Sequence, residues 1–187
     1  SAYFGTPLIL PPTVSDSDKM PSSLLTLTKE LNAAVPNYTA RKLQGISHKP
    51  TPLWMQQRLR VCDIRPIGLV VDITNYVLLE TGQPLHAFDK KMIHDETISI
   101  RYATPQEKFC TLDGDTLSLN TNDIVICTKN QPIALGGIMG GSNSEVTDQT
   151  TDIILESAQF NPVSIRKSAR RLVKRTESAI RFEKGVD

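Results

Sequence analysis

Four polar side chains stand out because they interrupt apolar stretches of the sequence. Thr74 and Asn75 fall on the apolar face expected of a helix over residues 67–80, and Glu156 directly follows a run of three apolar residues. A hydroxyl, amide or carboxylate that is buried without a partner costs free energy, so each needs an internal hydrogen bond or a ligand. His86 has the chemistry of an acid or base, although a structural histidine hydrogen-bonded within a loop is the favoured interpretation.

The segment GGIMGG at residues 136–141 is a dense cluster of glycines. It lacks the Lys-Ser/Thr pair of a phosphate-binding loop and the strand–loop–helix spacing of a dinucleotide-binding fingerprint. A tight turn is therefore the favoured interpretation. The alternative is that glycine lets the backbone around Gly137 and Gly140 approach a polar substrate closely.

Histidine and cysteine spacing argues against several kinds of site. The three histidines form neither an HxH nor an HExxH pair, so we predict no metal site. There is no GxSxG elbow, and no cysteine lies beside a histidine in a recognisable nucleophile motif. The three cysteines match neither a disulfide framework nor a zinc pattern, so we expect a reducing, cytoplasmic location.

The stretch at residues 166–184 is strongly basic, with eight cationic and two anionic side chains in a chain whose net charge is +1. Two series of cations repeat every fourth residue: Arg166, Arg170, Lys174 and Lys167, Arg171, Arg175. One helix would present them as two adjacent rows. The rows predict either a solvated helix face or a surface that contacts nucleic-acid phosphates, and nothing indicates base-specific readout.

Composition limits the class of protein further. With 187 residues, of which 39% are hydrophobic and 22% charged, the chain is predicted to form a soluble globular domain. The small net charge excludes a globally basic nucleic-acid binder, and we expect no DNA partner. The apolar runs are too short to span a membrane, and no signal peptide is apparent, so no membrane association is expected.

The elements that must position these residues begin with helices. Residues 1–37 are predicted to be a linker, proline-rich up to residue 23, with a short helix over residues 23–35. The main domain is predicted over residues 38–187. It begins with a strand over residues 38–46. Thr51 and Pro52 predict the N-cap and first turn of a helix over residues 51–62. Residues 67–80 favour a strand by propensity, but their length and the following Gly82 and Pro84 predict a helix.

The pattern changes to β structure from Glu96 onward. Apolar residues alternate from 98 to 102, residues 111–117 form a predicted hairpin with an Asp-Gly turn, and a buried strand is expected to end on Glu156. Asn161 and Pro162 then predict the cap and first turn of the basic helix. The fold class is therefore α+β, with helices packed on a mainly antiparallel sheet over residues 96–155.

Several longer motifs occur in a fixed order along the chain. They are SHKPTPLWMQQRLR at 47–60, IRPI at 64–67, VDITNYV at 71–77, GQPLHAFD at 82–89, LDG at 112–114, GGIMGG at 136–141, LESA at 155–158 and RFEKGVD at 181–187. Through these motifs, about four fifths of the chain resembles the B3/B4 domain of the bacterial phenylalanyl-tRNA synthetase β subunit. Where relatives usually have alanine, this chain has Ser178, which alters the expected shape of the pocket.

The resemblance implies an editing domain that hydrolyses tyrosine wrongly attached to tRNA(Phe). The family's catalytic positions correspond to Thr74, Asn75 and His86, and its substrate-binding positions to Glu156, Gly137, Gly140, Thr176 and Ser178. A positioned water would attack the ester, while Glu156 and a glycine N–H read the tyrosine hydroxyl. Such a second selection step is needed because an apolar synthetic pocket rejects an added hydroxyl only about a hundredfold.

The resemblance also implies partners. They would be the 3′ end of tRNA(Phe) carrying tyrosine and the α subunit of an α2β2 enzyme, with Arg166, Arg170 and Lys174 contacting tRNA. No cofactor is expected in this domain, because the parent enzyme's ATP and Mg²⁺ sites would lie outside this chain. One alternative is a non-catalytic module that binds tRNA or supports the subunit. Another is a free-standing trans-editing protein, although the abrupt ends of the chain argue against it.

Overall fold

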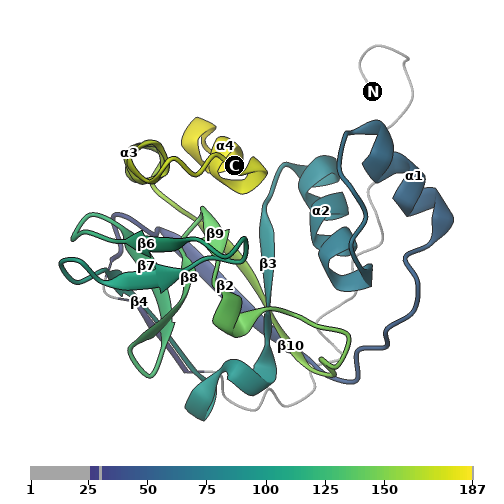
Figure 1. The fold of residues 1–187 in the computed structure, drawn as a ribbon, viewed down its shortest axis with the longest axis horizontal. Helices are drawn as coiled ribbons and strands as arrows, with labels where there is room; N and C mark the ends of the chain where they lie inside the picture. The colour runs from purple at the N-terminus through teal and green to yellow at the C-terminus, as the bar shows by residue number, and fades with distance from the viewer. Residues whose placement is uncertain (1–25, 30, 187) are drawn as a thin grey trace.

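The computed structural model describes residues 26–29 and 31–186, which form three β-sheets and four α-helices (Figure 1). The helices are α1 (Leu53–Val61), α2 (Leu69–Thr81), α3 (Pro162–Leu172) and α4 (Glu177–Lys184), with 3₁₀ turns at Lys90–Met92, His94–Glu96 and Ser142–Ser144. The strands are β1 (Thr26–Lys29), β2 (Asn37–Leu43), β3 (Leu85–Asp89), β4 (Thr97–Tyr102), β5 (Lys108–Cys110), β6 (Thr116–Ser118), β7 (Ile124–Thr128), β8 (Gln131–Leu135), β9 (Met139–Gly140) and β10 (Ile153–Gln159).

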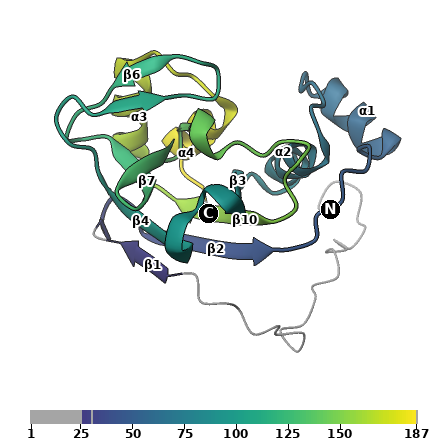
Figure 2. The ribbon, with the colours of Figure 1, turned by 60° about the horizontal axis from the view of Figure 1, so that its bottom comes forward.

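The three-stranded sheet brings together segments that are far apart in sequence. Its order is β2-β10-β3 and both pairings are antiparallel, so β10 is the central strand (Figure 2). The register places Glu156 opposite Ala40 on β2 and opposite His86 on β3. Directly opposed residues of an antiparallel pair project from the same face of the sheet. The side chains of Glu156 and His86 therefore share one face.

The five-stranded sheet contains the most deeply buried strand. Its order is β1-β4-β7-β8-β9, and β1 with β4 is its parallel pair. Every residue of β7 is buried, because this central strand has the core on both faces. Phe160 and Phe182 join the same core and pack edge to face, with ring centroids 5.0 Å apart.

The helices form two pairs at different places around the sheets, as Figure 1 shows. In one pair, α1 packs on α2 and α2 packs on β3. In the other pair, α3 packs on α4. The N-terminus of α3 is capped as predicted, because Asn161 Oδ1 accepts hydrogen bonds from the backbone N–H groups of Val163 and Ser164.

The structure confirms an α+β fold with mostly antiparallel strands, but the predicted arrangement of one sheet over residues 96–155 is wrong. Residues 85–89 form strand β3 rather than a loop. The first helix pair packs on this strand, and therefore on the three-stranded sheet rather than on the five-stranded sheet. The error arose because residues 85–89 alternate only weakly and their pairing partner lies far along the chain.

Two predictions near the N-terminus are also wrong. Within residues 23–35, Thr26–Lys29 is a strand that pairs in parallel with β4, not a helix. Thr51 does not cap α1, because its hydroxyl instead donates to Asp72 Oδ2 at 2.5 Å and the helix begins at Leu53. Residues 1–25 of the expected linker over residues 1–37 lie outside the described residues.

The basic helix is shorter than predicted. It ends at Leu172 because Val173 adopts a left-handed backbone conformation with φ of 55°. Lys174 and Arg175 therefore lie beyond the helix, and the two predicted rows of cations do not continue to their third members.

Candidate functional site

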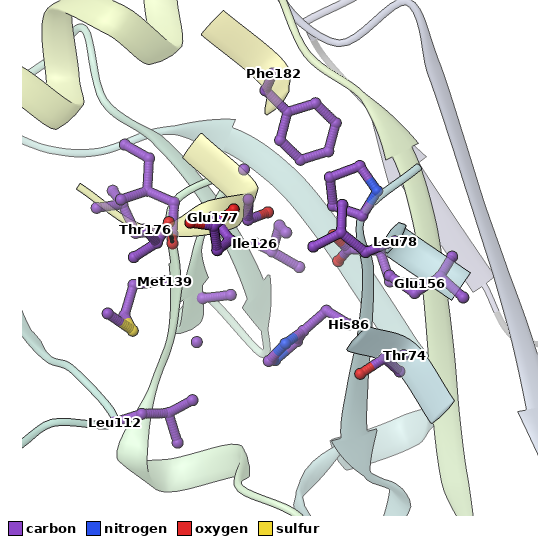
Figure 3. Close-up of a pocket in the computed structure, with 18 of the residues that line it drawn as sticks. Thr74, Leu78, His86, Leu112, Ile126, Met139, Glu156, Thr176, Glu177 and Phe182 are labelled. Carbon is purple, nitrogen blue, oxygen red and sulfur yellow. Dashed lines mark hydrogen bonds between the residues drawn. The ribbon is translucent and has the colours of Figure 1, made fainter. Parts of the chain in front are cut away.

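A pocket of about 260 Å³ lies between α2, β3, the glycine segment and the start of α4 (Figure 3). In Figure 3, Thr176 and Glu177 line it from the side of α4, whereas Thr74 and His86 lie on the side of α2 and β3. The pocket is lined by every residue predicted for catalysis or substrate binding: Thr74, Asn75, His86, Gly137, Gly140, Glu156, Thr176 and Ser178. Residues scattered over about a hundred sequence positions thus share one cavity.

Glu156 is the buried acid of this pocket, with 6% of its surface exposed. Burial raises the pKa of its carboxyl from 4.5 to about 7, because the charged form is poorly solvated there. It lies in the middle of β10 rather than at the end of a strand, which corrects the prediction. It also has a partner that the sequence did not reveal, since the Tyr38 hydroxyl donates to Glu156 Oε2 at 2.7 Å. Within the described residues, no cation bonds to it.

His86 faces the pocket from β3. Its ring packs edge to face on Phe88, with centroids 4.6 Å apart. Burial lowers the pKa of the imidazole from 6.5 to about 4, so the ring is neutral at pH 7. The prediction of a hydrogen-bonded histidine in a loop is wrong, because His86 lies on strand β3. Among the described residues, neither ring nitrogen has a hydrogen-bond partner. The nitrogens are therefore available to a water or a substrate.

The glycine segment is both a tight turn and a wall of the pocket. Gly137 has φ of +69°, and a Cβ there would lie 2.9 Å from Ile165 Cδ1. At Gly140, a Cβ would lie 2.6 Å from His86 Cε1 and 2.8 Å from Leu112 Cδ1. Distances this short are not tolerated, so Gly140 must lack a side chain for His86 to occupy its place.

The remaining predicted residues differ in how much of their hydrogen bonding is already used. The Thr74 hydroxyl donates to the carbonyl oxygen of Val71 in its own helix at 2.8 Å. The Thr176 hydroxyl donates to the carbonyl oxygen of Ile138 at 2.8 Å and accepts from the backbone of α4, which fastens that helix to the glycine segment. Asn75 lines the pocket without a hydrogen-bond partner in the described chain. Asn75 is therefore better placed than Thr74 to contact a ligand.

The three residues predicted to bind tRNA do not act as one row. Arg166 and Arg170 are exposed on α3 and do not line the pocket. Lys174 instead donates to Asp113 at 2.6 Å and Asp115 at 2.5 Å, and these bonds raise the pKa of its ammonium group. Lys174 therefore holds the β5–β6 hairpin, and its prediction as a free cation of a helix face is wrong.

Sequence reasoning missed the partner of Glu156 and most of the apolar lining. Tyr38 was assigned to a strand, but its contact with Glu156 spans 118 residues of sequence. The contact depends on the long-range pairing of β2 with β10, and neither segment alone predicts that pairing. Other pocket residues that were not predicted are Leu78, Pro84, Leu85, Leu112, Ile126, Ala134, Leu135, Ile138, Met139, Glu177 and Phe182.

Two kinds of feature are absent from the described residues. Among them, no cluster of three or more histidine, cysteine or carboxylate side chains is arranged to bind a metal ion. None of the helices in the described part of the chain has the length and apolarity needed to cross a membrane.

Comparison with known proteins identifies the family of the chain. Residues 34–187 match the family model described as the B3/4 domain. The full chain is 49% identical to phenylalanine–tRNA ligase beta subunits of Staphylococcus aureus strains USA300 and COL, and it spans 23% of their length. An N-terminal fragment of the phenylalanyl-tRNA synthetase beta subunit from Pyrococcus horikoshii has a similar fold, with a TM-score of 0.55 and 13% identity over 80% of this chain and 49% of that one. The chain thus belongs to the B3/4 domain family.

Proposed function

We propose that this chain is the editing domain of a phenylalanine–tRNA ligase β subunit and hydrolyses tyrosine from mischarged tRNA(Phe). The observation that carries the proposal is the buried carboxyl of Glu156 opposite the neutral imidazole of His86 in a largely apolar pocket. The pocket volume of about 260 Å³ is below the roughly 300–1,000 Å³ typical of sites for drug-sized ligands. It therefore suits a single amino-acid side chain. The names of the similar Staphylococcus aureus proteins support the same assignment.

Selection for tyrosine is expected because only tyrosine, and not phenylalanine, brings a hydrogen-bond donor to the buried carboxyl of Glu156. A buried carboxylate gains a hydrogen bond when a tyrosine hydroxyl enters the pocket and gains none from phenylalanine. The apolar lining, including Leu78 and Phe182, accepts the aromatic ring of either amino acid. Glu156 is therefore the group that distinguishes the two esters.

Hydrolysis is proposed to use a water held by the pocket. His86 is neutral at pH 7 and its pKa of about 4 makes it a weak base, so its role is to orient the water by a hydrogen bond rather than to take its proton. The Asn75 amide is the second group available for this purpose. A ribose hydroxyl of the tRNA 3′ end would complete the alignment of water and ester.

The proposal also defines partners. The substrate is the tyrosine-bearing 3′ end of tRNA(Phe), with Arg166 and Arg170 as exposed cations for its phosphates. The α subunit of the parent α2β2 ligase would supply amino-acid activation with ATP and Mg²⁺ outside this chain. The proposed hydrolysis uses no cofactor in this domain. The cytoplasm, where tRNA is charged, is the proposed location, and it suits the three free cysteines.

The proposal is tested by deacylation of Tyr-tRNA(Phe) and Phe-tRNA(Phe), using this chain and the same domain within its parent ligase. Hydrolysis of the tyrosyl ester is expected, and Glu156→Ala is expected to reduce the preference for it by roughly tenfold to a hundredfold. Melting temperatures must be measured in parallel, because the substitution leaves the Tyr38 hydroxyl without its acceptor. Glu145→Gln, which removes an exposed carboxylate away from the pocket, is the matched control.

Two outcomes contradict the proposal in different ways. Intact tyrosine preference in Glu156→Ala would remove Glu156 as the selecting residue. Binding of tRNA without hydrolysis, in both the isolated chain and the parent ligase, would favour a non-catalytic module of the same subunit.

A further inference from the structure

Tyr38 lies beside the acid of the pocket, on the same face of the three-stranded sheet. It projects from β2, the strand that flanks β10 on the side opposite β3. Its ring is 7% exposed, and its hydroxyl donates to Glu156 Oε2 at 2.7 Å. Tyr38 does not line the pocket, whereas Glu156 does. The contact therefore reaches Glu156 from the protein interior and leaves the pocket open.

We propose that Tyr38 is a positioning residue for substrate selection, because its hydroxyl occupies one carboxylate oxygen of Glu156 and leaves the other to accept the hydroxyl of a tyrosyl substrate. This inference rests on the proposed function and extends it to a residue that would not itself touch the substrate. The Tyr38 hydroxyl and the substrate hydroxyl are chemically the same group. One carboxylate would thus hold an internal and an external phenol together.

The hydrogen-bonding capacity of a carboxylate supports this arrangement. Its two oxygens offer about four lone-pair sites, so one donor from Tyr38 leaves sites for a second donor. A glutamate side chain is long, and without a fixed contact it samples several rotamers. Because Tyr38 and Glu156 both lie on strands of the same sheet, their hydrogen bond limits where the carboxylate points. Such support from a neighbouring residue is what keeps a selecting group in its productive geometry.

Tyr38 also influences the charge of Glu156. Burial is the larger influence and raises the pKa of the carboxyl, whereas the hydrogen bond from Tyr38 lowers it. The other titratable groups around the pocket are His86 on β3, which is neutral, and Glu177 at the start of α4. In the part of the chain that the structure describes, neither one bonds to Glu156. Tyr38 is thus the group that favours the ionised, purely accepting form.

The experiment compares the parent chain with Tyr38→Phe, which keeps the buried ring and removes only the hydroxyl. The probes are tyrosyl- and phenylalanyl-adenosine linked through a 3′ amide, which bind without being hydrolysed. The preference for the tyrosyl probe is expected to fall about tenfold to a hundredfold in Tyr38→Phe. In the same variant, NMR titration of the Glu156 carboxyl is expected to show a higher pKa than in the parent chain. Tyr76→Phe is the control, because its hydroxyl is bonded to Arg58 outside the pocket.

A double variant separates positioning from a merely structural role. If Tyr38 acts through Glu156, then Tyr38→Phe combined with Glu156→Ala should reduce the preference no further than Glu156→Ala alone. Additive reductions would overturn the inference. So would a Tyr38→Phe variant with the parent's preference and an unchanged pKa of Glu156.

The failure of this inference can be told apart from the failure of the proposed function. Absence of ester hydrolysis by the parent chain and parent ligase counts against the function, while the binding preference still tests Tyr38. Equal binding of the two probes by the parent chain would overturn the role of Tyr38 together with tyrosine selection by Glu156.

Discussion

The pocket and the basic C-terminal surface use titratable residues in opposite ways. In the pocket, Glu156 and His86 lie on neighbouring strands, and burial moves both toward their neutral forms, with pKa values of about 7 and about 4. On the C-terminal surface, Lys174 lies between two aspartates, whose hydrogen bonds favour its charged form. Arg171 likewise donates to the buried carboxylate of Asp123.

The difference shows that the local environment, not the residue type, determines what a charged side chain does. Desolvation dominates in the pocket, where it is the main cause of the pKa shifts of His86 and Glu156. Ion pairing dominates on the surface, where Lys174 and Arg171 attach the C-terminal segment to a hairpin and a loop. Arg166 and Arg170 are exposed on α3, so they belong to neither of these two environments. The following predictions test each side of this comparison.

The largest expected effects are two opposite contributions of Glu156 and His86 to the pH dependence of the free energy of unfolding. The folded pKa of Glu156 is raised from 4.5 to about 7, so its contribution to the free energy of unfolding falls as pH rises through that window. The folded pKa of His86 is lowered from 6.5 to about 4, so its contribution rises between those values. Each pKa shift corresponds to about 3 kcal/mol. In the unsubstituted chain, the two contributions change in opposite directions with pH and nearly cancel.

Single substitutions should expose the two slopes separately. In Glu156→Gln, the free energy of unfolding is expected to rise by about 3 kcal/mol from pH 4 to 6.5, because the contribution of His86 is no longer opposed by that of Glu156. In His86→Asn, it is expected to fall by about 3 kcal/mol from pH 4.5 to 7. Urea unfolding across this pH range measures both. If the free energy of unfolding depends on pH in the same way in the unsubstituted chain and in both variants, burial does not shift the pKa values of Glu156 and His86.

Next in size is the effect of adding one methyl group to the pocket wall. Gly140→Ala places a Cβ 2.6 Å from His86 Cε1, so the imidazole or the strand must move. We expect a decrease of about 1–3 kcal/mol in stability and a strong decrease in tyrosyl-ester hydrolysis. Gly68→Ala is the control, since a Cβ there meets nothing within 4 Å. Equal behaviour of the two variants would show that His86 tolerates displacement.

Adjacent arginines on α3 should differ in their effect on stability. Arg171→Ala removes a donor from Asp123, which still accepts from Ser168 and from the backbone of Asn120, so a cost of about 1 kcal/mol is expected. Arg170→Ala removes an exposed side chain and is expected to change stability by no more than about 0.5 kcal/mol. Chemical denaturation of the two variants gives the comparison, and equal costs would contradict it.

The smallest effect on the fold is expected from removing the exposed cations. If Arg166 and Arg170 bind phosphates, the Arg166→Ala/Arg170→Ala variant should bind tRNA more weakly whatever its sequence. The slope of log affinity against log salt should fall by roughly one for each phosphate-binding arginine that is removed. Lys174→Ala should leave that slope unchanged, because Lys174 is already bonded to aspartates. A slope that is unchanged in the double variant would make α3 a solvated face.

Local patterns were enough to predict several parts of the fold. Apolar spacing placed a helix near α1, segment length and the following Gly82 and Pro84 placed one near α2, and the Asn161–Pro162 pair marked the start of α3. These signals depend only on neighbouring residues. The pocket residues were identified through ordered motifs that resemble a family, and the structure brings all eight into one cavity. Their roles in catalysis and binding stay predictions.

The sequence by itself thus determined the fold class, the main helices and eight of the residues that line the pocket. Only the tertiary structure decided which groups are paired. Pairing of β2 and β3 with β10 gave Glu156 its partner Tyr38 and its neighbour His86, and the left-handed Val173 directed Lys174 to the aspartates of the hairpin. These contacts join residues tens to more than a hundred positions apart. Burial and long-range hydrogen bonds depend on how the whole chain packs, so local sequence patterns cannot specify them.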